Sequence, residues 1–272
     1  MPQIQRYPRT ARIAKRVLPT TGMLLSSARL QSTISLIEMA AAILQGKGSG
    51  SGWDMRGEVI AAMRFIRPGA IVFDVGANMG EWSREIRREL HGAVTLYLFE
   101  PQETCGRYLE PLVADGAIWT KAAVGESDGT ASLYSPGDAA GNASLHQRRD
   151  TYFCERTFNP HDVMVVSLDS FMERRKIGTV DFMKMDIEGH ELFALCGARQ
   201  ALASRAIKAM SFEFGSGNIN SRTSFHDYWD LLTGYKYELH RVLPGGRLLR
   251  ITEYSEELEY YRGVSNYIAI AS

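Results

Sequence analysis

The 272-residue chain has few cysteines, no long apolar run and no net charge. Cys105, Cys154 and Cys196 form no CxxC pair, which argues against a zinc or redox motif and favours a reducing cytoplasm. No apolar run approaches the roughly 20 residues that span a bilayer. The 31 basic residues equal the 31 acidic ones, which excludes a strongly basic nucleic-acid binder, and a hydrophobic fraction of 45% excludes dominant disorder.

The first 37 residues lack acidic side chains. Residues 38–272 contain 25 of the 31 basic residues and all 31 acidic residues, so this part of the chain carries a net charge of −6. The leader's cations are Arg6, Arg9, Arg12, Lys15, Arg16 and Arg29. A transit peptide, a basic arm that touches anionic surfaces and a poorly ordered extension all fit this composition. A secretory signal is not expected, because no clean apolar core precedes a small-residue cleavage site.

The sequence predicts two parts, residues 1–52 and 53–272. Residues 32–45 carry apolar side chains at helical spacing, which predicts an amphipathic helix packed on the main domain. The glycine-rich segment 46–52 that follows predicts a flexible joint. The N-terminal part is therefore a basic arm with a helix and a joint, and the remainder is one organised domain.

Strand and helix patterns alternate through the domain. The predicted strands are 71–75, 94–99, 117–124, 130–134, 163–167, 180–185, 207–214, 235–241, 247–251 and 265–270. The predicted helices are 81–90, 103–113, 191–202 and 224–232. Short apolar runs that end in polar residues are typical of buried parallel strands. Repeated β-α units predict an α/β fold with a doubly wound, mostly parallel sheet and helices on both faces.

The first predicted strand ends in a glycine loop that contains Asp74, Gly76, Asn78 and Gly80. Glycines allow a tight turn and a close approach to a ligand, and the next helix offers free N–H groups to an anion. The spacing D-x-G-x-x-x-G is neither the dinucleotide fingerprint nor a P-loop, so a dehydrogenase is disfavoured. Ligands of such sheets bind beyond the carboxyl ends of the strands, which makes this loop a candidate site.

Further polar residues follow later strands. Glu100 lies 20 residues beyond Gly80, where a carboxylate can accept hydrogen bonds from ribose hydroxyls, although a solvated loop acid is the alternative. The predicted strand 180–185 is followed within six residues by Asp186, Glu188, His190 and Glu191. Helix N-termini favour acids, which accounts for part of this cluster, and we assign the rest to catalysis or substrate positioning. Glu213, at another strand end, either lines the pocket or faces solvent.

Residues 135–162 have the composition of a long loop, which is typical of a lid or a binding loop. The loop contains His146, Arg148, Arg149 and His161. It could close over a substrate, its arginines could bind an acidic sugar or phosphate, or it could be a plain solvated loop. We take His146 and Arg148 as candidate substrate-binding residues together with Glu213.

The motifs FDVGANMGEWS, LFEPQ, VSLDSF, VDFMKMDIEGHE, SFEFG and SNYIAI together resemble the FkbM family of S-adenosylmethionine-dependent methyltransferases. The resemblance covers roughly residues 55–270. It implies a class I, Rossmann-like fold with a seven-stranded sheet, here preceded by an N-terminal helical extension. It also implies S-adenosyl-L-methionine as cofactor and O-methyl transfer to a hydroxyl of a small molecule or glycan, with a sugar or polyketide-like acceptor.

The resemblance also implies which residues hold the cofactor. They are Asp74, Gly76, Asn78, Gly80, Glu100, Pro101, Ala123 and Asp186. The glycine loop would wrap the methionine end, Asp74 would support the loop or the amino group, and Glu100 would hold the ribose hydroxyls. The adenine would lie near Ala123, and Asp186 and Glu188 would edge the methyl-transfer site.

An alcohol acceptor benefits from a base that takes its proton as the new bond forms. His190 is the first candidate because histidine titrates near neutral pH, although a helix-start role is the alternative. Asp186 is a close rival and could instead orient the acceptor hydroxyl. A metal held by Asp186, Glu188 and Glu213 is an alternative whose spacing is not diagnostic, and no metal is predicted.

Two other classes of protein stay open. One is an RNA or DNA methyltransferase that uses the basic arm as a phosphate tether. The acidic body and the MDIEG loop argue against it, so no nucleic-acid partner is expected. The other is a protein that binds S-adenosylmethionine without catalysis. The sequence leaves the oligomeric state and the identity of the acceptor open.

Overall fold

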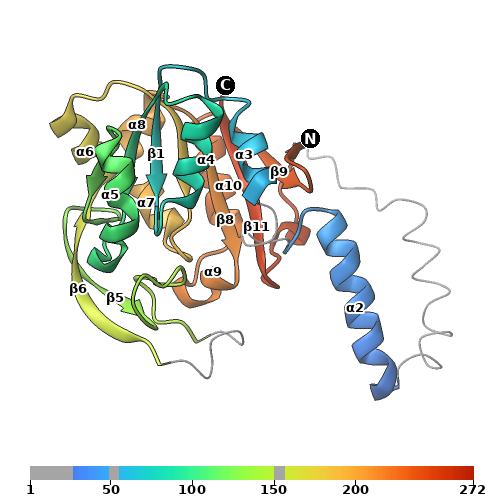
Figure 1. Cartoon of the computed structure of the whole chain (residues 1–272). Helices are drawn as coiled ribbons and strands as arrows, with labels where there is room; N and C mark the ends of the chain where they lie inside the picture. Colours follow the sequence, from blue (N-terminus) through green and yellow to red (C-terminus); the bar gives the residue numbers. More distant parts are fainter. Residues whose placement is uncertain (1–26, 49–54, 150–156) are drawn as a thin grey trace. The chain divides into compact units, whose positions relative to one another are not determined.

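The structure, a computed structural model, describes residues 27–48, 55–149 and 157–272. The chain divides into two compact units, Met1–Ile43 and Leu44–Ser272, and each is described by itself. The predicted amphipathic helix is present as α2 (Ala28–Leu44; Figure 1), and its packing on the domain stays a prediction. Residues 1–26, which hold most of the basic arm, and Cys154 lie outside the described residues. Within the described ranges, no helix is both long enough and apolar enough to cross a bilayer.

The beginning of the predicted joint is packed rather than loose. Gly46 has φ +73°, and a Cβ there would lie 2.3 Å from the carbonyl oxygen of Val242. The backbone N–H of Gly48 donates to Ser265 Oγ at 2.9 Å. These glycines therefore permit close backbone approach instead of free movement. Joint residues 49–52 lie outside the described part of the chain.

The described residues form a main sheet of eight strands in the order β10-β9-β11-β8-β7-β1-β2-β3. Its strands are β1 (Ala70–Val75), β2 (Val94–Phe99), β3 (Ile118–Thr120), β7 (Val180–Met185), β8 (Ile207–Gly215), β9 (Tyr237–Leu243), β10 (Arg247–Ile251) and β11 (Val264–Ala271). The strands from β8 to β3 pair in parallel, whereas β11 runs antiparallel to both β8 and β9. The predicted α/β class is confirmed. The sheet has eight strands rather than seven because β10 pairs with β9 as an added edge.

Helices pack on both faces of this sheet (Figure 1). They are α3 (Met55–Ala62), α4 (Glu81–Glu89), α5 (Gly106–Ala114), α6 (Leu168–Arg175), α7 (Glu191–Cys196), α8 (Arg199–Ala203), α9 (Ser216–Ser221) and α10 (Phe225–Gly234), with short 3-10 turns at Glu103–Cys105 and Glu256–Leu258. Side chains of a strand alternate between faces, so Val72 joins the core under α3, α4 and α5, and Phe73 joins the core under α6, α7, α8 and α10. The sequence analysis did not predict α3, α6, α8 and α9 as separate helices.

A second, three-stranded sheet has the order β4-β6-β5. Its strands are β4 (Ala123–Val124), β5 (Gly129–Ser135) and β6 (Asn159–Val166). The predicted strand 117–124 is wrong as one element, because a turn at Ala122 separates β3 from β4, and β4 pairs with β6 instead of the main sheet. The predicted loop 135–162 is also shorter, since β6 begins at Asn159 and pairs antiparallel with β5.

Candidate active site

A cavity of about 320 Å³ lies beyond the carboxyl ends of β1, β2 and β7. Its lining comes from the ends of these three strands and the loops that follow them, from α3 and the start of α4, from β4 and β5, and from the segment between β5 and β6. The position is the one where open α/β sheets bind their ligands. Gly76, Asn78, Glu100, Asp186 and His190 line it, so the fold brings most of the predicted site residues together.

The glycine loop is shaped by contact with the loop after β7. Gly76 has φ +84°, and a Cβ there would lie 1.9 Å from the main-chain oxygen of Asp186. No side chain fits that position, and the left-handed conformation also favours glycine. Gly80 differs, because it does not line the cavity. A Cβ at Gly80 would meet the side chains of Leu112 and Leu109, so this glycine permits α4 to pack on α5.

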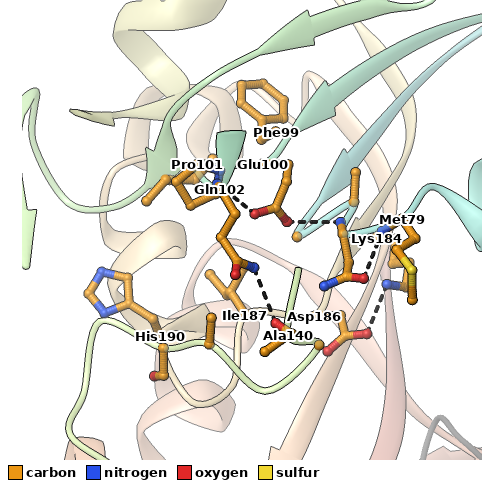
Figure 2. A pocket seen from close by; sticks show the side chains of 18 of the residues that line it. Met79, Phe99, Glu100, Pro101, Gln102, Ala140, Lys184, Asp186, Ile187 and His190 are labelled. Carbon is orange, nitrogen blue, oxygen red and sulfur yellow. Dashed lines mark hydrogen bonds and ion pairs between the residues drawn. The ribbon is translucent and has the colours of Figure 1, made fainter. Parts of the chain in front are cut away.

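Glu100 is fixed at the edge of the cavity (Figure 2). One carboxylate oxygen accepts the backbone N–H of Asn78 at 2.8 Å, and the other accepts that of Gln102 at 2.9 Å. The side chain is buried, and burial raises the pKa of Glu100 despite these two hydrogen bonds. Each oxygen has a second lone pair, so the carboxylate can still accept ligand hydroxyls. Pro101 lines the cavity beside it.

Two residues near Glu100 and Asp186 were missed by the sequence analysis. Gln102 donates from Nε2 to the carbonyl oxygen of Ala140 at 3.1 Å, which ties the β5–β6 segment to the end of β2. Lys184 lines the cavity, and its Nζ lies 3.0 Å from Asp186 Oδ2. A lysine among the buried apolar residues Phe182, Met183 and Met185 of β7 was the available signal for this residue.

Asp74 lies beneath the glycine loop and does not line the cavity. It is fully buried, accepts a hydrogen bond from Ser83 Oγ at 2.6 Å, and lies 3.9 Å from the Lys184 ammonium. Burial raises the pKa of Asp74, while Lys184 and Ser83 oppose the rise. The hydrogen bond from Ser83 ties Asp74 to α4, and the role expected for Asp74, to support the glycine loop or the amino group of the cofactor, stays a prediction.

The carboxylates around Lys184 keep its side chain protonated. Burial alone would lower the pKa of Lys184, but the carboxylates around it, Asp186 and Asp74 foremost, raise the pKa above its ordinary value. The side chain of Asp186 is 23% exposed and lines the cavity. A charged lysine thus holds a carboxylate that a ligand can reach (Figure 2).

His190 lines the cavity on the other side of Ile187 from Lys184 (Figure 2). Its Nδ1 lies 2.9 Å from His146 Nε2, and its ring stacks on Phe193. Burial, helped by His146, lowers the pKa of His190 to about 3. Burial also lowers the pKa of His146, which does not line the cavity. An imidazole with so low a pKa is a weak proton acceptor.

The other candidate residues lie behind the cavity wall. Glu188 has φ +55° and forms an ion pair with the buried Arg148, and neither residue lines the cavity. Ser144 Oγ donates to the main-chain oxygen of Glu188 at 2.9 Å. These contacts fasten the β5–β6 segment to the loop after β7. Arg148 therefore binds a carboxylate of its own chain in this structure.

Glu213 lines a separate cavity of about 10 Å³, beside Glu58 and Lys184. Burial raises the pKa of Glu213 well above its ordinary value, and nearby carboxylates add to the rise. Glu191 is also buried, and its Oε1 accepts the backbone N–H of Ile187 at 2.9 Å. Among the described residues, no group of three or more His, Cys, Asp and Glu side chains is arranged to hold a metal ion.

Residues 74–239 match the model of the family described as the methyltransferase FkbM domain. The chain belongs to this family, since the match covers more than half of its length. It is a methyltransferase whose methyl donor is S-adenosylmethionine. No curated protein matches the sequence.

Solved structures of low sequence identity also match the chain. A precorrin-6y C5,15-methyltransferase from Geobacter metallireducens is 9% identical, with 81% of this chain and 89% of that chain covered and a TM-score of 0.45. An S-adenosylmethionine-dependent O-methyltransferase from Thermotoga maritima is 11% identical, with 80% and 65% covered and a TM-score of 0.42. Likenesses at this level say nothing about the acceptor.

The residues present fit S-adenosylmethionine. The absence of a side chain at Gly76 lets the glycine loop and the loop after β7 meet at the cavity, where both contribute to the lining. Glu100 offers a fixed carboxylate for ribose hydroxyls, and Ala123, Val124 and Leu133 offer an apolar wall for a flat base. Of the cofactor residues that the sequence predicts, all but Asp74 and Gly80 line the cavity, and their contact with the cofactor stays a prediction.

Proposed function

We propose that the protein transfers a methyl group to a hydroxyl of a small molecule or glycan, with Asp186 as the base. When bound, S-adenosylmethionine supplies an electrophilic methyl group on a sulfonium. The observation that carries the proposal is the partly exposed carboxylate of Asp186 on the cavity wall, 3.0 Å from the Lys184 ammonium. Such a carboxylate can accept the proton of an acceptor hydroxyl as the new O–C bond forms.

The preference for Asp186 over His190 rests on their surroundings. His190 is buried against Phe193 and His146, and its pKa of about 3 leaves it little basicity. Asp186 reaches the cavity with a lysine beside it that keeps the carboxylate oriented. His190 then contributes packing of the wall, and His146 supports it from behind.

The lining of the cavity supports an uncharged acceptor over a nucleic acid. Among the described residues, four carboxylates line it, those of Glu58, Glu81, Glu100 and Asp186, against one ammonium, that of Lys184. Phosphate recognition requires an excess of basic groups, which this lining does not offer. The best-placed arginine of the region, Arg148, is engaged by Glu188.

The decisive experiment is a transfer assay with S-adenosylmethionine labelled in the methyl group. Purified protein is offered a panel of sugars and other polyols, with RNA and DNA as separate arms. Label in an alkali-stable ether on a sugar or polyol, lost in Asp186→Asn, supports the proposal. Label confined to nucleic acid, or cofactor binding with no transfer to any hydroxyl in the panel, contradicts it.

A further inference from the structure

Two side chains of opposite charge line one part of the cavity, and the proposed function gives a task to only one of them, Lys184. Glu58 of α3 and Lys184 of β7 both line the main cavity, and both also line the small cavity behind it. Glu58 lies outside residues 74–239, so the family match says nothing about it. The strand order of the main sheet separates Lys184 of β7 from β3, and the residues that follow β3 or pair beside them, Ala123, Val124 and Leu133, form the apolar end of the cavity.

Glu58 is held in place from the sheet. Asn266 of β11 is buried and donates from Nδ2 to Glu58 Oε1 at 2.7 Å. The helix that carries Glu58 is itself fixed, because Gly246 approaches it so closely that a Cβ would lie 2.5 Å from the main-chain oxygen of Gly57. The carboxylate is thus positioned before any ligand arrives, which lowers the entropy cost of binding.

Lys184 is the matching cation. Its ammonium carries three donor protons, and Asp186 accepts one of them at 3.0 Å. Asp74 lies farther away, at 3.9 Å. The surrounding carboxylates, Glu58 among them, keep the side chain charged. A fixed carboxylate and a fixed ammonium therefore line one end of the same cavity (Figure 2 shows the lysine).

The methionine end of S-adenosylmethionine is a zwitterion with an α-ammonium and an α-carboxylate. If the adenine lies at the apolar end and the ribose at Glu100, the methionine extends toward Glu58 and Lys184. We propose that these two residues bind the zwitterion, with Glu58 accepting from the α-ammonium and Lys184 donating to the α-carboxylate. This inference rests on the cofactor position proposed above. It makes α3, which precedes the matched family domain, a part of the cofactor site.

The test compares two ligands by calorimetry, S-adenosylmethionine and methylthioadenosine, which lacks the amino-acid end. The proteins are the wild type, Glu58→Gln and the control Glu85→Gln, which removes a carboxylate of α4 that pairs with Arg88 outside the cavity. Glu58→Gln should weaken S-adenosylmethionine binding by about tenfold or more, as expected for a charge-assisted hydrogen bond. Its affinity for methylthioadenosine should equal that of the wild type, and the control should match the wild type for both ligands.

Decarboxylated S-adenosylmethionine tests the role of Lys184. The wild type should bind it more weakly than the intact cofactor, by about tenfold. Lys184→Met should bind both compounds equally, and Lys184→Arg, which keeps the charge, should retain a preference. Thermal unfolding of every variant confirms folding. If Lys184→Met does not fold, equal wild-type affinities for the two compounds still overturn the role of the lysine.

The possible failures are distinct. A wild type that binds neither S-adenosylmethionine nor methylthioadenosine overturns the proposed cofactor position and this inference with it. A wild type that binds both, with Glu58→Gln either unchanged or equally weakened for the two ligands, overturns only the assignment of Glu58. If Glu58→Gln binds S-adenosylmethionine more weakly than the wild type but binds methylthioadenosine equally well, the result supports the assignment of Glu58.

Discussion

The backbone N–H of Asn78 donates to the carboxylate of Glu100 at 2.8 Å, across 22 positions of sequence. This bond joins the glycine loop after β1 to the end of β2 and aims one acid at the cavity. The loop and the acid are therefore one unit, and a change in either is expected to alter ligand binding.

Glu100→Gln should weaken S-adenosylmethionine binding. The amide replaces one carboxylate oxygen by a donor, which faces either the N–H of Asn78 or that of Gln102 without an acceptor. Loss of one charge-assisted hydrogen bond corresponds to about tenfold or more in the dissociation constant. Calorimetric titration measures the dissociation constant of S-adenosylmethionine, and Glu103→Gln is the control because Glu103 is exposed. Equal affinities of wild type and Glu100→Gln would remove Glu100 from the cofactor site.

Gly76→Ala and Gly69→Ala should separate close approach from backbone strain. Both glycines have positive φ, +84° and +86°, but a Cβ at Gly76 would lie 1.9 Å from a main-chain oxygen and one at Gly69 would meet nothing within 4 Å. Gly69→Ala should lose only about 1–2 kcal/mol of unfolding free energy from strain. Gly76→Ala should lose more and bind cofactor poorly. Chemical denaturation and calorimetry measure the two effects, and similar losses for both variants would contradict the close contact.

Glu191→Gln should change how stability depends on pH. Burial raises the pKa of Glu191 from 4.5 to about 8, so between these values the folded state holds a proton that the unfolded state has lost. Stability from this group is fully present below pH 4.5 and falls as the pH rises, by about 1.4 kcal/mol per unit, until about pH 8. The glutamine variant does not titrate, so its unfolding free energy should fall less steeply from pH 5 to 8.

Denaturant unfolding at a series of pH values checks this prediction. The exposed Glu173→Gln serves as control, since it removes a carboxyl group from α6 without changing the buried one. A wild type and a Glu191→Gln variant with parallel pH profiles would show that Glu191 is ionised in the folded protein at neutral pH.

Asp186→Asn should lower turnover far more than cofactor affinity. Removing a general base costs typically 10²–10⁴-fold in rate, about the range expected here. His190→Gln should retain most of the turnover because the pKa of His190, about 3, already makes it a poor base. Steady-state kinetics with the first acceptor identified measures both variants. The reverse order, with His190→Gln the more damaged, would restore the histidine as base.

Much of the fold, and several of the residues that line the cavity, followed from the sequence. Buried parallel strands such as 180–185 are rich in apolar residues, so their pattern locates β7 to the residue, and the polar residues after them mark the ligand edge. The sequence singled out Gly76 and Glu100 because tight turns and ribose recognition favour those residue types, and both residues line the cavity. The resemblance to the FkbM family then predicted S-adenosylmethionine as the cofactor, and the family match confirms this prediction.

Only the tertiary structure decided strand pairing and the surroundings of the site residues, because a local sequence pattern does not contain long-range contacts. Strand 117–124 divides because β4 gains a better partner in β6, a contact more than 40 residues away. His190 loses its basicity only because folding buries it beside His146, and Arg148 becomes unavailable only because folding pairs it with Glu188. The sequence by itself determined which side chains stand at strand ends. Burial and long-range pairing, which depend on the whole fold, determined which of them face the cavity with a charge.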